Sequence, residues 1–233
     1  ILIRNLNEAD NLRLTLHALK KQVAGFDYEV VVVDNESGDD SVNVATAAGC
    51  RVVPLARNAF TFGHALNVGI EQCKGAFILI LSAHVILLNE HFVDRIPSFF
   101  EDSSVAGLRF VHASDAAQVK AAVKDGPQKL VYTDDANFAA EHWMQLMVNH
   151  CAAIRKSCWQ QQPFDEKIFA SEDKQWAMDI LKKGYALVYR VPCYYLYVKS
   201  PGRDGKIKRM AIETAAKELI TGKTDPANQG ILS

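Results

Sequence analysis

The sequence predicts an α/β protein with a mostly parallel central sheet flanked by helices. Three observations predict this class. Strand-like segments alternate with segments of helical periodicity over the first 112 residues, as in a chain of βαβ units. Two strands, 29–34 and 76–81, are continuous apolar runs, which is typical of strands covered on both faces. Gly49, Gly75 and Gly184 follow predicted helices and provide their ends.

The individual elements follow from local patterns. A short strand over 1–3 precedes a helix over 8–21, in which Leu12, Leu16 and Leu19 recur at helical spacing. Further strands are expected at 51–55, 105–112 and 186–191, the last ending before Pro192. Further helices are expected at 39–48, 63–73, 89–101, 137–148, 173–183 and 207–220. The polar stretch 115–135 predicts loops or an edge hairpin.

Composition and charge restrict the function classes. The 233 residues are 49% apolar and 23% charged, as in an ordinary globular protein rather than a disordered or fibrous one. The 26 Lys and Arg nearly balance the 27 Asp and Glu, which disfavours a dedicated nucleic-acid-binding domain. The longest apolar stretch, 76–88, is too short to cross a bilayer as a helix.

The cysteines predict reduced thiols in a cytoplasmic protein. Their number is odd, and no pair has the C-x-x-C spacing of a zinc or redox site. They are Cys50, Cys73, Cys151, Cys158 and Cys193.

In parallel sheets, ligands bind at the carboxyl ends of the strands, so the residues that follow each strand are candidate site residues. Asn5 and Asn7 follow the first strand. The run Asp34-Asn35-Glu36 follows the second, where an amide or carboxylate can pair with the edge of a nucleobase. The alternative is a turn whose Asp and Ser side chains cap the next helix.

Two further sites could hold an anion or a metal. Ser82 and His84 follow the buried strand 76–81, and the imidazole could bind a metal or contact a phosphate. The alternative is a histidine hydrogen-bonded at a turn. Arg57 and His64 flank the start of a helix, a position that favours anions.

Glu172 and Asp173 begin the helix predicted over 173–183. Carboxylates at a helix start are stabilised by the helix dipole, which is sufficient to explain them. An ionised carboxylate there also suits a general base. We expect Lys174 and Trp176 to face the acceptor, with a place in the core as the alternative for the indole.

In this order and spacing, these segments resemble a family 2 glycosyltransferase of the GT-A fold. This group includes bacterial rhamnosyltransferase-like and capsule or O-antigen enzymes. The resemblance covers residues 1 to about 190, and its most specific block is PFDEKIFASEDKQWAMDILKKGY. The other matching stretches are ILIRNLNEADNLRLTLHAL, VVVDNESGDDS, FTFGHALNVGI and FILILSAH.

The resemblance implies an inverting transfer of a sugar from a UDP- or dTDP-linked donor to a hydroxyl of a glycan or lipid-linked glycan. Asp173 matches the base that deprotonates this hydroxyl, with Glu172 beside it, and Asn35 matches the residue that contacts the nucleobase. The expected setting is the cytoplasm, at the inner face of the membrane. The nucleotide-binding set is Asn5, Asn7, Asp34, Asn35, Glu36, Arg57, His64 and Ser82.

The sequence departs from the family pattern where a metal would bind. The Asp-x-Asp motif expected after the strand 76–81 is replaced by Ser82-Ala83-His84, so His84 is the remaining candidate ligand for Mn²⁺ or Mg²⁺. Many relatives also have a histidine near 194–197, where this chain has tyrosines. The alternative is no metal, with Arg57, His64 and the basic segment 199–209 neutralising the diphosphate.

These matches predict a catalytic unit over 1–198, with a nucleotide-sugar half at 1–112 and an acceptor half at 113–198. A basic helical extension and tail follow at 199–233, and they could contact an anionic membrane. A non-catalytic sugar-nucleotide-binding module of a larger polysaccharide-synthesising protein is the alternative. A nucleotidyltransferase is disfavoured because no glycine-rich phosphate loop follows the first strand.

Overall fold

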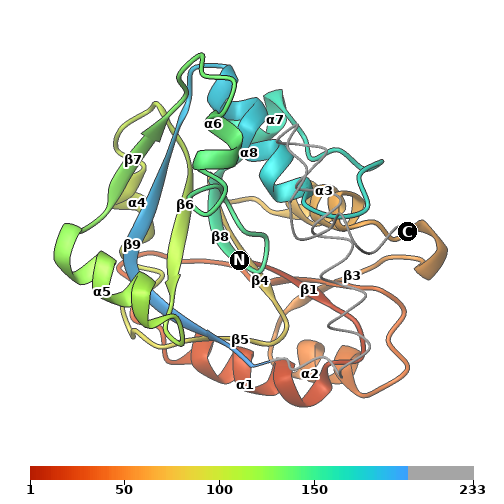
Figure 1. Cartoon of the computed structure of the whole chain (residues 1–233). Coiled ribbons are helices and arrows are strands. Elements are labelled where there is room, and N and C mark those ends of the chain that lie inside the picture. Colours follow the sequence, from red (N-terminus) through yellow and green to blue (C-terminus); the bar gives the residue numbers. More distant parts are fainter. Residues whose placement is uncertain (199–233) are drawn as a thin grey trace, which may run out of the picture.

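The computed structural model describes residues 1–198, and the predicted extension 199–233 lies outside the described residues. Its centre is one nine-stranded sheet with the order β3-β2-β1-β4-β8-β6-β9-β5, and β7 pairs with β9. Helices cover both faces of this sheet (Figure 1). The predicted α/β class is confirmed.

The first half of the sheet is parallel, as predicted. β1 (Leu2–Asn5) lies between β2 (Val31–Asp34) and β4 (Phe77–Ser82), and β3 (Arg51–Pro54) forms the edge. Right-handed crossovers in such units place helices over the sheet. The helices are α1 (Ala9–Lys20), α2 (Ser41–Ala47) and α3 (Phe62–Gln72), and the 3₁₀ turn η1 covers Arg57–Ala59.

The second half is mixed. β8 (Cys151–Arg155) runs antiparallel between β4 and β6 (Val105–His112), and it was not predicted. β9 (Ala186–Tyr197) pairs parallel with β6 and antiparallel with β5 (Val85–Leu87) and β7 (Gln128–Val131). The sheet is therefore parallel only in part.

Several predicted boundaries are wrong. The helix expected at 89–101 is only α4 (Ile96–Phe99), because Pro97 fits the first turn of a helix but not its interior. The helix expected at 137–148 is only α6 (Phe138–Glu141). The stretch expected as loops holds α5 (Ala116–Asp125), which Asp115 caps by accepting a 3.0 Å hydrogen bond from the Gln118 amide.

The sequence predicts that the last strand ends before Pro192. This prediction is wrong, because β9 continues to Tyr197. Proline has no amide to donate to a strand ladder, so it is tolerated only where the ladder is interrupted. The pairing with β6 shifts register here, from Val191 opposite Phe110 to Tyr194 opposite Val111. Arg190, just before, has a φ of 57°.

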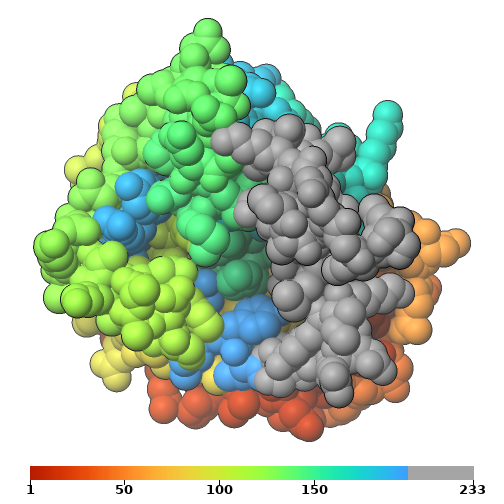
Figure 2. All heavy atoms as spheres, in the orientation of Figure 1, coloured from red at the N-terminus to blue at the C-terminus, as the bar shows by residue number. Residues whose placement is uncertain are grey.

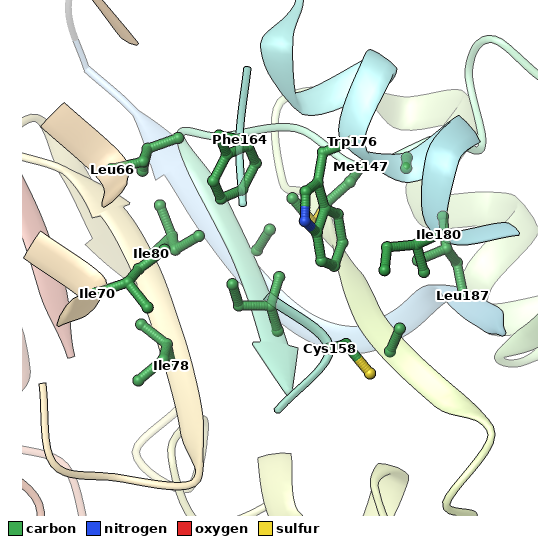
Figure 3. Packing of buried hydrophobic residues seen from close by; sticks show 14 of the residues in the cluster. Leu66, Ile70, Ile78, Ile80, Met147, Cys158, Phe164, Trp176, Ile180 and Leu187 are labelled. Carbon is green, nitrogen blue, oxygen red and sulfur yellow. The ribbon is translucent and has the colours of Figure 1, made fainter. Parts of the chain in front are cut away.

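The core has two layers, one on each face of the sheet. One packs α1 and α2 against the strands. The other packs α3 and α8 (Glu172–Lys182) against the opposite face, with α7 (Lys156–Gln161) at its edge. In this second layer Trp176 and Phe164 lie between Leu66 of α3 and Ile180 of α8 (Figure 3). The second layer therefore connects residues 1–112 to residues 113–198.

Candidate active site

The exits of β1 and β2 form one polar network. The side-chain amide of Asn5 donates to Asp34 Oδ1 over 2.8 Å and to Ser37 Oγ over 3.1 Å. Ser37 donates its hydroxyl to Asp34 Oδ1, over 2.6 Å, and its backbone amide to Asp34 Oδ2, over 2.9 Å. Asn7 joins from the other side, where its Oδ1 accepts from the Gly38 amide over 2.7 Å. The structure thus brings together Asn5, Asn7 and Asp34.

Two buried amide oxygens at these exits have no hydrogen-bond partner among residues 1–198. They belong to Asn5 and Asn35, which are 4% and 5% exposed. A buried acceptor without a partner is costly to leave unpaired, so such groups suggest a missing donor. The sequence predicted both residues as nucleotide contacts.

Glu36, in the turn after β2, is hydrogen-bonded to Arg57. The guanidinium of Arg57 donates to the Glu36 carbonyl over 2.7 Å, and the Arg57 amide donates to Glu36 Oε2 over 3.0 Å. Glu36 has a φ of 52°, a left-handed conformation that costs energy for a non-glycine residue. The two residues thus lie together just after the exit of β2.

Ser82 and His84 lie at the β4 exit, and both are buried. His84 Nδ1 lies 3.6 Å from Glu8 Oε1, and its ring packs edge-on against Tyr197 with centroids 4.6 Å apart. Within residues 1–198, no three His, Cys, Asp or Glu side chains are grouped so that they could hold a metal ion. With Glu8, the group offers one imidazole, one hydroxyl and one carboxylate, which is fewer carboxylates than Mn²⁺ or Mg²⁺ prefers.

The end of β9 completes the surroundings of His84. His150 Nε2 lies 2.8 Å from the Tyr195 hydroxyl, and its ring also packs edge-on against Tyr197, at 5.1 Å. The last residues of β9 reach the surface between α5 and α1 (Figure 2). We did not predict this aromatic cluster, because its members come from strands far apart in the sequence.

Glu172 and Asp173 form a buried carboxylate pair at the first turn of α8. Asn149 binds both: its side-chain amide donates to Glu172 Oε1, and its backbone amide donates to Asp173 Oδ2 over 2.8 Å. The backbone amide of Lys174 donates to Asp173 Oδ1 over 2.7 Å. Ser171, just before the pair, has a φ of 64°, so the chain enters the helix through a left-handed residue.

The pair is electrostatically unequal. Burial, and then repulsion by Asp173, raise the pKa of Glu172 to about 7, and the guanidinium of Arg4 opposes this rise. A carboxyl group kept away from water favours its neutral form, so a large share of Glu172 carries a proton at neutral pH. Glu172 is fully buried, whereas Asp173 retains 8% exposure.

Arg4 connects this pair to the strand exits. It donates from Nη2 to the carbonyl and to Oδ1 of Asn149, over 3.1 and 3.0 Å, and its guanidinium lies 5.2 Å from the ring centroid of Phe62. Burial lowers the pKa of Arg4, and the nearby carboxylates of Glu172 and Asp173 partly oppose this decrease. Next to Asn149, the His150 carbonyl accepts from the Ser82 amide over 3.0 Å. The segment 149–150 therefore joins the β4 exit, β1 and the carboxylate pair in one site.

The two predicted acceptor contacts, Trp176 and Lys174, are both buried. Trp176 is 1% exposed and stacks on Phe164, and its indole donates to the Gln162 carbonyl over 2.6 Å. Lys174 is buried, and its ammonium donates to the carbonyls of Trp143 and Leu146, each over 3.0 Å. Trp176 belongs to the second core layer and Lys174 is buried against these carbonyls, and contact of either with an acceptor stays a prediction.

His64, the remaining member of the predicted nucleotide-binding set, lies in the first turn of α3. Its Nδ1 lies 2.9 Å from Glu166 Oε2, on the loop that leads to α8. The same Glu166 accepts from Asn67 of α3 over 2.9 Å. The structure therefore places His64 between the two halves and gives it a carboxylate partner.

A model of the family described as "Glycosyl transferase family 2" matches residues 1–161. This chain belongs to glycosyltransferase family 2. Its similarity extends to the O-antigen chain rhamnosyltransferase WbaN of Salmonella anatum, which is 24% identical over 182 residues. That match covers 74% of the chain and 57% of WbaN, so the chain spans little more than half the length of this relative.

Solved structures confirm the GT-A fold. A mannosyltransferase from Pyrobaculum calidifontis, in complex with GDP-Man and Mn²⁺, aligns with 97% of the chain and 65% of its own, at a TM-score of 0.68 and 18% identity. S. aureus TarS with UDP-GlcNAc aligns with 94% of the chain and 69% of its own, at a TM-score of 0.69 and 18% identity. M. tuberculosis glucosyl-3-phosphoglycerate synthase aligns over 97% of this chain and 81% of its own chain. The TM-score is 0.68 and the sequence identity is 16%.

Among the helices of residues 1–198, none combines the length and apolar character needed to cross a membrane.

Proposed function

We propose that this glycosyltransferase transfers a sugar with inversion from a UDP- or dTDP-linked donor to a hydroxyl of a glycan or lipid-linked glycan. The observation that carries the proposal is the segment 149–150, which holds the buried Glu172–Asp173 pair beside the exits of β1 and β4. Inversion needs one carboxylate in line with the attacking hydroxyl, on the face opposite the leaving diphosphate. A single base in this position suffices.

Asp173 is the base in this proposal, and Glu172 supports it. Asp173 retains some exposure, whereas Glu172 is fully buried. The raised pKa of Glu172 lets it hold a proton, which removes one negative charge from beside the base. The amides of Asn149 and Lys174 fix both oxygens of Asp173, so its carboxylate is oriented before the acceptor arrives.

The nucleotide binds in this proposal at the exits of β1 and β2, in the half comprising residues 1–112. The unpaired oxygen of Asn35 accepts from N3–H, the one N–H group that uracil or thymine retains in a nucleotide, and Asn5 lies beside it. Asp34 and Asn7 stabilise the conformation of this surface through their hydrogen bonds to Ser37 and Gly38. The acceptor binds over residues 113–198.

The diphosphate is bound without a metal in this proposal. The donor set at the β4 exit does not fit a divalent ion, so no step depends on one. His84 and Arg57 lie at the strand exits and can donate to phosphate oxygens. The basic segment 199–209 adds positive charge, which also favours binding at the inner, cytoplasmic face of a membrane.

A thermal-shift screen against UDP, GDP, CDP and dTDP, each with and without Mn²⁺, tests the donor class. A ligand that binds only the folded state raises its apparent stability. We expect UDP or dTDP to stabilise the protein in both conditions. Turnover of the corresponding nucleotide sugar then tests transfer. Binding without turnover for any acceptor would support the alternative, a non-catalytic module of a larger polysaccharide-synthesising protein.

A further inference from the structure

We infer that Asn67, on α3, is a positioning residue that sets the place of the catalytic base. The inference rests on the proposed function, since it assumes that Asp173 is that base. It concerns the FGHALN motif, whose histidine the sequence predicted to bind nucleotide. The structure places this motif against the loop 162–166 instead.

The side chain of Asn67 uses all of its hydrogen-bonding capacity on this loop and on α7. Its Oδ1 accepts from the Phe164 amide over 3.0 Å and from the Trp159 indole over 2.8 Å. Its Nδ2 donates to the Phe164 carbonyl and to Glu166 Oε1, each over 2.9 Å. An asparagine amide offers two donors and two acceptor sites, so this one is saturated.

Neighbouring residues of α3 reinforce the contact. His64 Nδ1 binds the second oxygen of Glu166, so both oxygens of that carboxylate are held by α3. Gly63 lets the loop approach closely, because a Cβ at this position would collide with the Asp165 backbone. Gly63, His64 and Asn67 thus present one side of α3 to the loop.

The loop 162–166 in turn packs against α8. The ring of Phe164 stacks on Trp176, with centroids 5.4 Å apart and planes inclined by 29°. The two rings lie next to each other in Figure 3. Trp176 also donates to the Gln162 carbonyl, so the loop is fixed to α8 at two points. Trp176 lies about one turn after Asp173 on this helix. Asn67 therefore couples the nucleotide-sugar half to the helix that carries the base.

The function of this coupling is to keep Asp173 in line with the donor. A displacement of about 1 Å at a catalytic group can lower the rate by about 100-fold. We expect Asn67→Ala to lower kcat by roughly 10- to 100-fold, while Kd for the nucleoside diphosphate and KM for the donor stay unchanged. Glu166→Ala, in an exposed part of the contact, should have a smaller effect in the same direction.

The experiment measures kcat, donor KM and UDP or dTDP affinity for the full chain and its variants. Glu71→Ala, an exposed change on the same helix, is the matched control. Asn67→Asp keeps the acceptors but repels Glu166, and adding Glu166→Gln restores a donor opposite the new carboxylate. We expect the double variant to recover part of the kcat that Asn67→Asp loses. Hydrogen exchange should accelerate at 163–176 in Asn67→Ala.

Three outcomes would overturn the inference. One is a folded Asn67→Ala protein with unchanged kcat. Another is a loss of nucleotide affinity that accounts for the whole effect, which would return the motif to nucleotide binding. The third is a double variant no better than Asn67→Asp. A wild-type protein without turnover would instead refute the proposed function, and with it the catalytic role of this contact.

Discussion

The polar side chains at the exits of β1 and β2 and those at the start of α8 differ in the origin of their hydrogen-bond partners. At the strand exits, short polar side chains bond to one another within two neighbouring turns, as Asn5, Asp34 and Ser37 do. At α8, the pair Glu172–Asp173 depends on partners from distant segments, namely Asn149 and, through it, Arg4. The first network needs only the pairing of two adjacent strands, whereas the carboxylate pair needs β1, the segment before β8 and α8 together.

The comparison is tested most strongly by Asp173→Asn. The change keeps the size of the side chain but removes the base, so we expect turnover to fall by about 10³-fold with nucleotide affinity unchanged. Turnover of the identified nucleotide sugar and binding of its nucleoside diphosphate provide the two readouts. Asp179→Asn, a half-buried carboxylate on the same helix, is the control. Near-normal turnover in Asp173→Asn would show that the base lies elsewhere.

Glu172→Gln tests the energetic cost of the buried pair. The pKa of Glu172 is raised from 4.5 to about 7, so between these values the folded protein binds more protons than the unfolded chain. The free energy of unfolding therefore falls as the pH rises from 4.5 to about 7, by a total of about 3 kcal/mol. Glutamine cannot ionise, so the variant should match the wild type near pH 4.5 and exceed it by about that amount at pH 8.

Urea denaturation of both proteins at pH 4.5, 6 and 8 measures this difference. Glu71→Gln, the same change at an exposed position, is the matched control. A difference between Glu172→Gln and wild type that does not depend on pH would contradict the raised pKa.

Asn35→Ala tests the nucleotide surface and should act on binding alone. Its unpaired oxygen gains one hydrogen bond to the base, worth about 1 kcal/mol, so Kd should rise about fivefold. The kcat should change little, because the residue lies away from Asp173. Titration of UDP or dTDP measures the effect, with the exposed Asn43→Ala as control. Unchanged affinity would show that the base does not contact Asn35.

The smallest effect is expected from metal removal. Because Ser82 and His84 do not make a divalent site, EDTA should leave nucleotide affinity unchanged, and added Mn²⁺ should not increase it. Titration of UDP or dTDP in each condition provides the measurement. An affinity that depends strongly on Mn²⁺ would show that His84 acts as a ligand, together with oxygens of the diphosphate.

The sequence alone determined the parallel half of the sheet and the residues that follow its strands. Apolar runs and glycine stops are local patterns, so the ends of β1, β2 and β4, and with them Asn5, Asp34 and His84, could be predicted. The helix beginning with Glu172 and Asp173 was equally clear. Its family motif identified the candidate base.

Only the tertiary structure decided the surroundings of these residues. β8 inserts antiparallel between β4 and β6, and it brings Asn149 to the carboxylate pair and His150 to the tyrosines of β9. The same packing buries Trp176 and Lys174, and it places His64 beside Glu166. Such contacts join residues 23 to 102 positions apart, and a sequence pattern carries only near-neighbour information. Burial and partner choice therefore arise from the fold.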